Sequence, residues 1–316
     1  MTGVASGIQS QLGLKAETTV GTRVVPDRFF EFTKESLKGR VTYKNSNGIR
    51  AGRFIRRRRS KMQEWCEGDV EFEFAPQSTA LVWKHTLGTD VITGAGPYTH
   101  TFGYGPLDLL SLTIQVNRVD SSGTDRPFDY LGCQITRLRL AAKVGDFLMG
   151  TMSVYGSYED TSQSLASASY PSSWTPYTFV HGVLSIAGSA YDIWDISIDI
   201  PTGLATGRHQ IRSTTPSRPK PSLSQNTRDI TGVLTSDFVD LTAYNRAKNQ
   251  TAASLSLVFT SGTNVLTISG NVEFDVDTPT VQGEDVLKLT LPFTFLHATS
   301  DTSGFSVVLV NGDAAT

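Results

Sequence analysis

Residues able to carry acid–base, nucleophilic or metal chemistry are few and scattered in this chain. The five histidines lack the spacing of metal ligands, and two cysteines, Cys66 and Cys133, are too few for a zinc cluster or a disulfide framework. Asp146 with His100 could form an acid–base pair, but neither a nucleophile nor an orienting group accompanies them. We therefore predict that the protein is not an enzyme and uses no metal or cofactor.

The strongest chemical signal is a run of positive charge. The stretch AGRFIRRRRSK occupies residues 51–61, and eleven basic residues lie between Lys34 and Lys61, with only Glu35 to oppose them. The whole chain is nearly neutral, with 28 Lys plus Arg against 30 Asp plus Glu, so acidic residues elsewhere balance this run. Such a run binds either nucleic acid or an acidic protein surface.

The elements that position these residues are predicted to be mainly strands. Thr, Ser, Gly and Val are abundant, and most apolar runs alternate with polar residues, the period of a half-buried strand. No run of 18 apolar residues could span a membrane, so we expect no membrane anchoring. The predicted strands are 28–32, 69–74, 110–116, 133–144, 146–158, 191–200, 253–259, 264–276 and 285–295.

Two short helices and one linker complete the predicted order. The segment 76–88 begins with Pro and Ser and ends on Gly, and the segment 240–250 has Asp240 as its N-cap. Between the helices, the Ser-rich stretch 160–176 with two prolines is predicted to be a linker.

The order of elements on the two sides of this linker is the same, which predicts a duplicated domain. GIRAGR at 48–53 matches GLATGR at 203–208, and residues 132–152 align over 270–290 without a gap. The expected first domain is 1–159, with an N-terminal arm and a basic loop at 38–68. The expected second domain is 177–316, with a C-terminal tail.

Several phrases of the sequence carry a family resemblance. QLGLKAETTVGTRVVPDRFFEF, GIRAGR, SLTIQV, YLGCQITRLRLAAKVGD and SGNVEFDVDTPTVQGEDV appear in this order between about residue 10 and residue 298. In these phrases the chain resembles the major tail tube proteins of long-tailed, siphovirus-type bacteriophages. The resemblance implies two tandem tail-tube-like β-sandwich or barrel domains, each with one short flanking helix.

The resemblance also implies a function. Such domains form rings that stack helically into a hollow tube, the conduit for double-stranded DNA during genome ejection. Some relatives use six copies of one domain in each ring, and others use three copies of a duplicated chain. The internal repeat favours a homotrimeric, pseudo-hexameric ring here. The implied partners are the chain itself, other tail proteins at the tube ends, and tape-measure protein and DNA in the lumen. The implied location is the virion tail, assembled in the host cytoplasm.

Matched strands of the two halves carry opposite charges. Apolar Leu138 and Leu140 should face the core, as should Val272, Phe274 and Val276, while the alternate residues point to the other face. If the halves alternate around a ring, basic strands would meet acidic strands at the seams; otherwise these are ordinary solvated faces. The candidate seam or lumen-face residues are Arg137, Arg139, Glu273, Asp275 and Asp277.

The basic run is predicted to be an extended arm that contacts the next ring. Phe54 and Ile55 interrupt its charge, as expected of an arm that docks on protein, and a second basic connection spans 207–221. The alternatives are a β-sandwich adhesin displayed on a particle and a nucleic-acid-binding protein that uses the arginine-rich arm. The candidate inter-ring residues are Arg50, Arg53, Arg56, Arg57, Arg58, Arg59, Lys61, Arg208, Arg212 and Arg218.

Overall fold

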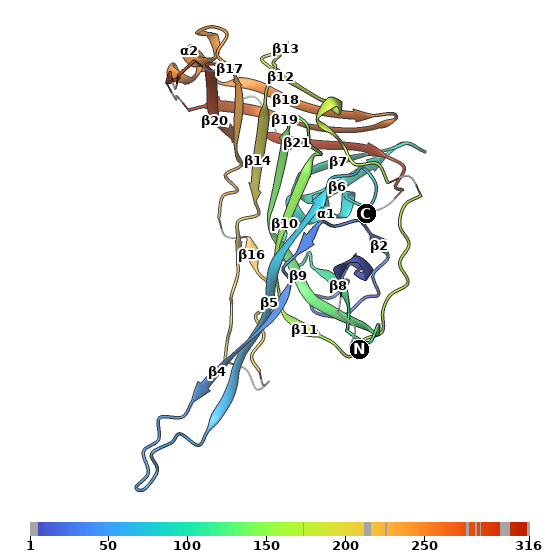
Figure 1. Ribbon diagram of the computed structural model, residues 1–316, viewed down its shortest axis with the longest axis vertical. Coiled ribbons are helices and arrows are strands. Elements are labelled where there is room, and N and C mark those ends of the chain that lie inside the picture. The colour runs from blue at the N-terminus through green and yellow to red at the C-terminus, as the bar shows by residue number, and fades with distance from the viewer. Residues whose placement is uncertain are drawn as a thin grey trace.

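The chain folds as a mainly β protein, as its composition predicts. Figure 1 shows long strands running lengthwise through the body, a second set crossing them at the upper end, and a hairpin projecting from the lower end. The computed structural model describes residues 6–172, 174–211, 216–224, 226–275, 278–281, 283–284, 286–297 and 304–314.

The N-terminal half contains the two longest strands, β5 and β9, with 15 and 19 residues. Each of them pairs with different strands along its length. After a 3-10 turn at Gly7–Gln9, the elements are β1 (Leu12–Ala16), β2 (Arg28–Phe29), β3 (Lys34–Glu35), β4 (Lys38–Asn45), β5 (Arg59–Glu73), α1 (Ala80–Leu87), β6 (Gly88–Thr93), β7 (Tyr98–Tyr104), β8 (Leu112–Val119), β9 (Asp125–Lys143), β10 (Met149–Gly156) and β11 (Tyr158–Asp160).

The C-terminal half begins with a second 3-10 turn, at Phe179–His181. Most of its strands alternate buried and half-buried residues, as in β14 and β20. Its elements are β12 (Gly182–Ile186), β13 (Ser189–Ala190), β14 (Asp195–Pro201), β15 (Leu204–Ala205), β16 (Leu223–Ser224), β17 (Thr231–Asp237), α2 (Thr242–Lys248), β18 (Ala253–Ser261), β19 (Asn264–Phe274), β20 (Lys288–Leu296) and β21 (Phe305–Asn311).

The two halves pair their strands in the same antiparallel order. In the first half the order is β1, β8, β9, β10, β5 and β3. In the second half it is β12, β18, β19, β20, β17 and β14. Each half also has its α-helix at the same place along the chain, after β5 or β17. The first half adds one hairpin, β6–β7, between its helix and β8.

The ungapped alignment of 132–152 over 270–290 needs correction. It aligns buried Cys133 with half-buried Asn271. In the structure Cys133 lies opposite the first residue of β8 and Val272 lies opposite the first residue of β18, so the strand pairing matches Cys133 with Val272. A β-bulge at Thr136 then absorbs one residue, so that Arg137 does match Asp275. The predicted core positions Leu138, Leu140, Val272 and Phe274 are all buried, while Val276 lies outside the described residues.

Two strand pairings join the halves. β14 lies antiparallel beside the C-terminal end of β9, so β3–β4, β5, β10, β9, β14, β17, β20 and β19 form one continuous sheet. At the other side β21 pairs with both β19 and β7. The predicted linker is packed against the first half: the Ala166 N–H donates to Gln115, and Trp174 stacks on Phe30.

Both predicted helices are present. α1 is almost completely buried between strands, with Trp83 against Phe74 and Phe102, and it ends at Gly88, whose φ of +119° disfavours other residues. Helix α2 begins at Thr242 with Leu241 as its N-cap, one residue after the predicted Asp240, whose carboxylate accepts a hydrogen bond from the Thr242 N–H at 2.7 Å.

His85 gives the fold a dependence on acid. Burial inside α1, and then the nearby Lys84 charge, lower the pKa of His85 from 6.5 to about 3. The neutral imidazole therefore stabilises the fold above pH 6.5, and this contribution is lost as pH falls toward 3, at about 1.4 kcal/mol per pH unit. We expect the free energy of unfolding of His85→Leu to fall by about 3 kcal/mol less than wild type between pH 7 and pH 4. Urea unfolding of both monomers at the two pH values measures this, and equal losses would contradict it.

Candidate assembly surfaces

The basic run forms the far end of the hairpin between β4 and β5, here called the arm (residues 38–65). Figure 1 shows the arm projecting well away from the body of the protein. Ile49, Phe54 and Ile55 are almost fully exposed at its end, where nothing in the chain covers them among the described residues. An exposed cluster of apolar and cationic side chains on a projecting hairpin is typical of a protein-docking element. The predicted inter-ring residues on the arm, all exposed, are Arg50, Arg53, Arg56, Arg57, Arg58, Arg59 and Lys61.

The base of the arm is held by pairs between β4 and β5. The Arg40 guanidinium pairs with Glu67 at 3.0 Å, and the Trp65 indole N–H donates to the same carboxylate at 3.0 Å. The Trp65 hydrogen bond is the largest cause that lowers the pKa of Glu67. Arg59 lies over the Tyr43 ring at 4.4 Å, so at least one of the four consecutive arginines also supports the hairpin.

The second basic connection runs along this base. The Ser217 N–H donates to the Met62 carbonyl and the Glu64 N–H donates to the Ser217 carbonyl, both at 3.0 Å. Arg218 pairs with Glu64 at 2.6 Å and stacks over Tyr158 at 3.4 Å. Two of the predicted inter-ring residues are thus engaged within the chain, because Arg208 also donates to the Pro221 carbonyl. Arg212 lies outside the described residues.

The pairing of β9 with β14 brings predicted seam residues to the junction of the halves. Arg137 forms a two-pronged ion pair with Asp199, and this hydrogen bonding raises the pKa of Arg137. Arg139 lies directly opposite Asp199 in the ladder, and Lys143 lies opposite Asp195. The acidic partner of Arg137 inside the chain is therefore Asp199.

The other predicted seam residues lie at the far end of the continuous sheet. Glu273 is half-buried, Asp275 is exposed, and Asp277 lies outside the described residues. Glu273 lies opposite Thr294 of β20, and the Asp275 N–H donates to the Pro292 carbonyl at 2.8 Å. The acidic end of β19 and the basic end of β9 are thus at different places in one chain.

A buried carboxylate fixes the N-terminal loop and was not singled out by its sequence pattern. Glu17 is only 8% exposed, and it accepts hydrogen bonds from the Gly21 N–H, the Ser111 and Thr113 hydroxyls and the Gly132 N–H, at 2.6 to 2.9 Å. It therefore joins β1, β8 and β9 at one point. Gly132 has a φ of +64°, which suits glycine at this close approach.

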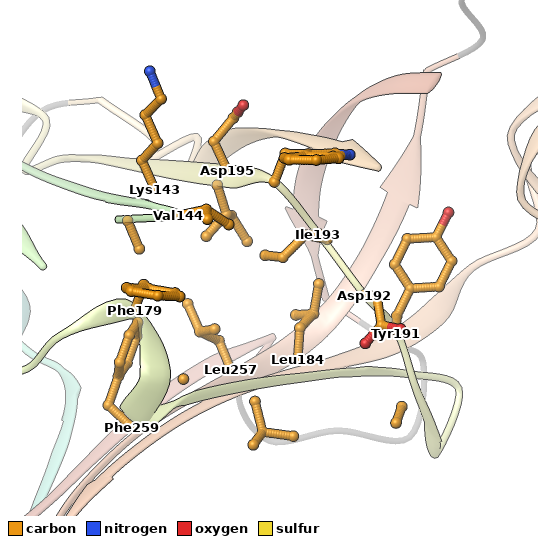
Figure 2. Close-up of a pocket in the computed structure, with 16 residues that line it drawn as sticks. Lys143, Val144, Phe179, Leu184, Tyr191, Asp192, Ile193, Asp195, Leu257 and Phe259 are labelled. Carbon is orange, nitrogen blue, oxygen red and sulfur yellow. The ribbon is translucent and has the colours of Figure 1, made fainter. Parts of the chain in front are cut away.

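The cavity in Figure 2, of about 230 Å³, lies at the junction of β9, β12, β14 and β18. Phe179, Leu184 and Ile193 point toward one another across it, whereas the charged ends of Lys143 and Asp195 point away. Catalytic pockets bring polar groups together over an apolar floor, and this one does not. It is a partly open apolar groove where the halves meet, and Phe179, Val183 and Trp194, which line it, are exposed.

The remaining candidates for chemistry are structural. His100 is buried between the Asp90 carboxylate and the Asp313 carbonyl, both at 2.9 Å. Asp146 lies in the turn between β9 and β10 and accepts from the Phe147 N–H. Cys66 and Cys133 are buried free thiols 3.8 Å apart.

Over the described part of the chain, no group of three or more His, Cys, Asp or Glu side chains is arranged to hold a metal ion. No helix found there has the length and apolar character needed to cross a membrane.

Comparison with protein-family models shows the family of the chain. A family model described as phage tail tube protein matches residues 7–295, which is most of the chain. No curated protein matches it.

Proposed function

Because the chain belongs to the phage tail tube protein family, and so has a structural role in the virion tail, we propose that it forms closed rings that stack into the tube. The tube would be the conduit for double-stranded DNA during ejection. Tape-measure protein and DNA would occupy its lumen, and other tail proteins would meet its ends. Assembly would take place in the host cytoplasm.

The observation that carries this proposal is the junction of the two halves. They pair their strands in the same order, and β14 of the second half continues the sheet of the first by pairing with β9. A head-to-tail contact between similar units generates a ring when the rotation it imposes closes on itself. The chain thus contains one example of the contact that ring formation would repeat between chains. Closing the sheets around a ring would also remove exposed sheet edges.

The first test is the number of chains in a ring. If each half occupies one of six similar places, a ring contains three chains, and its mass is three times 34.3 kDa. Native mass spectrometry of isolated rings measures this directly, and averaged electron micrographs of them should show six similar lobes. A ring of six chains would contradict the proposed three chains per ring. It would also contradict the proposal that the two halves occupy equivalent places in the ring.

Negative-stain images of the purified protein test the function itself. Stacked rings or tubes are the expected result. Isolated particles at every protein concentration would instead favour a particle-displayed binding domain or a nucleic-acid-binding protein.

We further propose that the arm makes contacts between rings. The arm extends beyond the sheet that would form the ring, and its apolar and basic end is exposed. From Asp229 to the C-terminus ten acidic residues oppose three basic ones, and acidic side chains of this region on the next ring would receive the arm.

A further inference from the structure

One edge of the continuous sheet has a partner in the first half and none in the second. On one edge of β9, β8 pairs with the residues up to Cys133, and β14 pairs with the residues from Arg137 onward. β18 pairs with β19 up to Val272, and the described residues that follow, 273–275, have no strand on that edge. Residues 273–275 are here called the β19 edge.

The strand that matches β14 is β3 together with β4. Both follow one register along β5, with Lys34 opposite Glu71 and Lys38 opposite Glu67. β14 pairs with β17 in the same way. β5 and β17 hold matching places in the two halves, because the last residue of β5 lies opposite the first residue of β10 and the last residue of β17 lies opposite the first residue of β20. Residues 34–41, here called the β3–β4 edge, thus hold the place in the first half that β14 holds in the second.

Counting along these pairs gives the matched residues. Arg137 lies opposite Ser153, Ser153 opposite Asp69, and the Ser36 N–H donates to Asp69. In the second half the corresponding series is Asp275, Pro292, Val233 and Ser197. Ser36 therefore matches Ser197, so that Lys38 matches Asp199 and Lys34 matches Asp195.

The charges on the two pairs of edges are reversed. Inside the chain, basic Arg137, Arg139 and Lys143 on β9 face acidic Asp195 and Asp199 on β14. Between chains, acidic Asp275 would lie opposite Arg40 and diagonal to Lys38 of the β3–β4 edge, as Arg137 lies opposite Pro201 and diagonal to Asp199 within the chain. The two wrong combinations, β9 with a β3–β4 edge and the β19 edge with a β14, would place like charges opposite each other, which opposes pairing.

We propose that these charges fix the order of the halves around the ring. The β19 edge of one copy pairs with the β3–β4 edge of a second copy, and Asp275 contacts Lys38 as Arg137 contacts Asp199 within the chain. The inference rests on the proposed ring. It adds the partner strands, their register and the reason why unlike halves alternate.

The β3–β4 edge is capped by side chains of the same chain, and its Leu37 carbonyl accepts hydrogen bonds from Arg118 and Tyr130. Its outward N–H groups at Leu37 and Gly39 donate to the Glu35 and Glu159 carboxylates, at 2.8 and 2.9 Å. Side-chain caps of this kind prevent unwanted strand pairing at an open edge. Lys38 is exposed, lies opposite Glu67 in the ladder and contributes to the lowered pKa of that carboxylate, and its side chain would also reach Asp275 of a second copy.

Charge reversal at this seam tests the inference. Lys38→Glu alone and Asp275→Lys alone should each lower the ring yield at fixed protein concentration by about tenfold or more, because like charges then oppose each other at every seam between chains. The double variant, Lys38→Glu with Asp275→Lys, should recover most of the yield. The matched control is Lys248→Glu, which changes charge by the same amount at the end of α2 and should form rings normally.

Ring yield is measured by native mass spectrometry, and the melting temperature of each monomer shows that it is folded. Wild-type rings together with undiminished rings from either single variant would overturn the inference, as would failure of the double variant to recover. Absence of rings from the wild type would instead overturn the proposed function on which the inference rests.

Discussion

Replacing the four consecutive arginines of the arm with serine is expected to abolish tubes while single rings still form. The four residues lie on the projecting hairpin, away from the paired edges that would close a ring. One exposed ion pair contributes only about 0.2–1 kcal/mol, but each chain would lose four charges, and every ring carries several arms. The substituted residues are Arg56, Arg57, Arg58 and Arg59.

Salt should reproduce this loss in the wild type. Exposed charge pairs are screened beyond about 8–10 Å at moderate ionic strength, whereas the main-chain ladders of a ring are not. Raising the salt concentration should therefore separate rings from one another before it breaks them. Electron micrographs that score tube length and ring number across a salt series measure both effects.

Two further variants show which part of the arm matters. Phe54→Ser with Ile55→Ser removes the exposed apolar side chains and keeps every arginine, so any shortening of its tubes reports apolar docking. Arg246→Ser with Lys248→Ser removes one half-buried and one exposed charge from α2, away from the arm, and should leave tubes unchanged. Normal tubes from the four-serine variant, with altered DNA retention, would assign the arginines to DNA, where each phosphate contact adds affinity and salt dependence.

Patterns local in sequence predicted most of the fold. The alternation of apolar and polar residues predicted β14, β18 and β20. Asp240, just before α2, and Gly88, just after α1, predicted the two helices. The sequence did not predict β21, because apolar residues do not alternate with polar ones in its run of valines and leucine. Val308 and Val310 are half-buried on the face opposite Val307 and Leu309. The hairpin β6–β7 was also not predicted. Thr, Gly and Asp dominate β6, and the segment GYG at 103–105, whose composition is typical of a turn, lies at the end of β7.

Contacts distant in sequence limited the prediction of the assembly surfaces. The charge of Arg137 and its outward direction follow from the strand period, but its partner Asp199 is 62 residues away and depends on how the halves meet. Arg218 looked free for another ring, yet it pairs with Glu64, 154 residues distant. Sequence reasoning placed Arg137 on the correct strand, but it predicted a loop at 38–68, where residues 38–45 and 59–68 belong to β4 and β5. It also could not tell which charges the chain neutralises internally.

Glu17→Ala is expected to cost about 3–5 kcal/mol of the free energy of unfolding, among the largest effects of a single substitution. The substitution removes the carboxylate and leaves two main-chain N–H groups and two hydroxyls without their acceptor, in a site that water barely reaches. Hydrogen bonds to a charged group are stronger than neutral ones, and buried donors left unpaired lose their hydration as well. Glu17→Gln retains the size of the side chain but turns one acceptor into a donor, so its loss should be intermediate.

Urea unfolding of the monomer measures these losses, with Glu31→Ala as the control. Glu31 is exposed, and its removal should change the free energy of unfolding by no more than about 0.5 kcal/mol. Because Glu17 joins β1 to the start of β8 and to Gly132 of β9, its loss should loosen the N-terminal loop before the β9–β14 junction. Hydrogen exchange would then rise first at residues 12–23 and only later at 195–201. A loss below about 1 kcal/mol, or exchange that rises first at β14, would show that the loop is fixed by apolar packing of β1 instead.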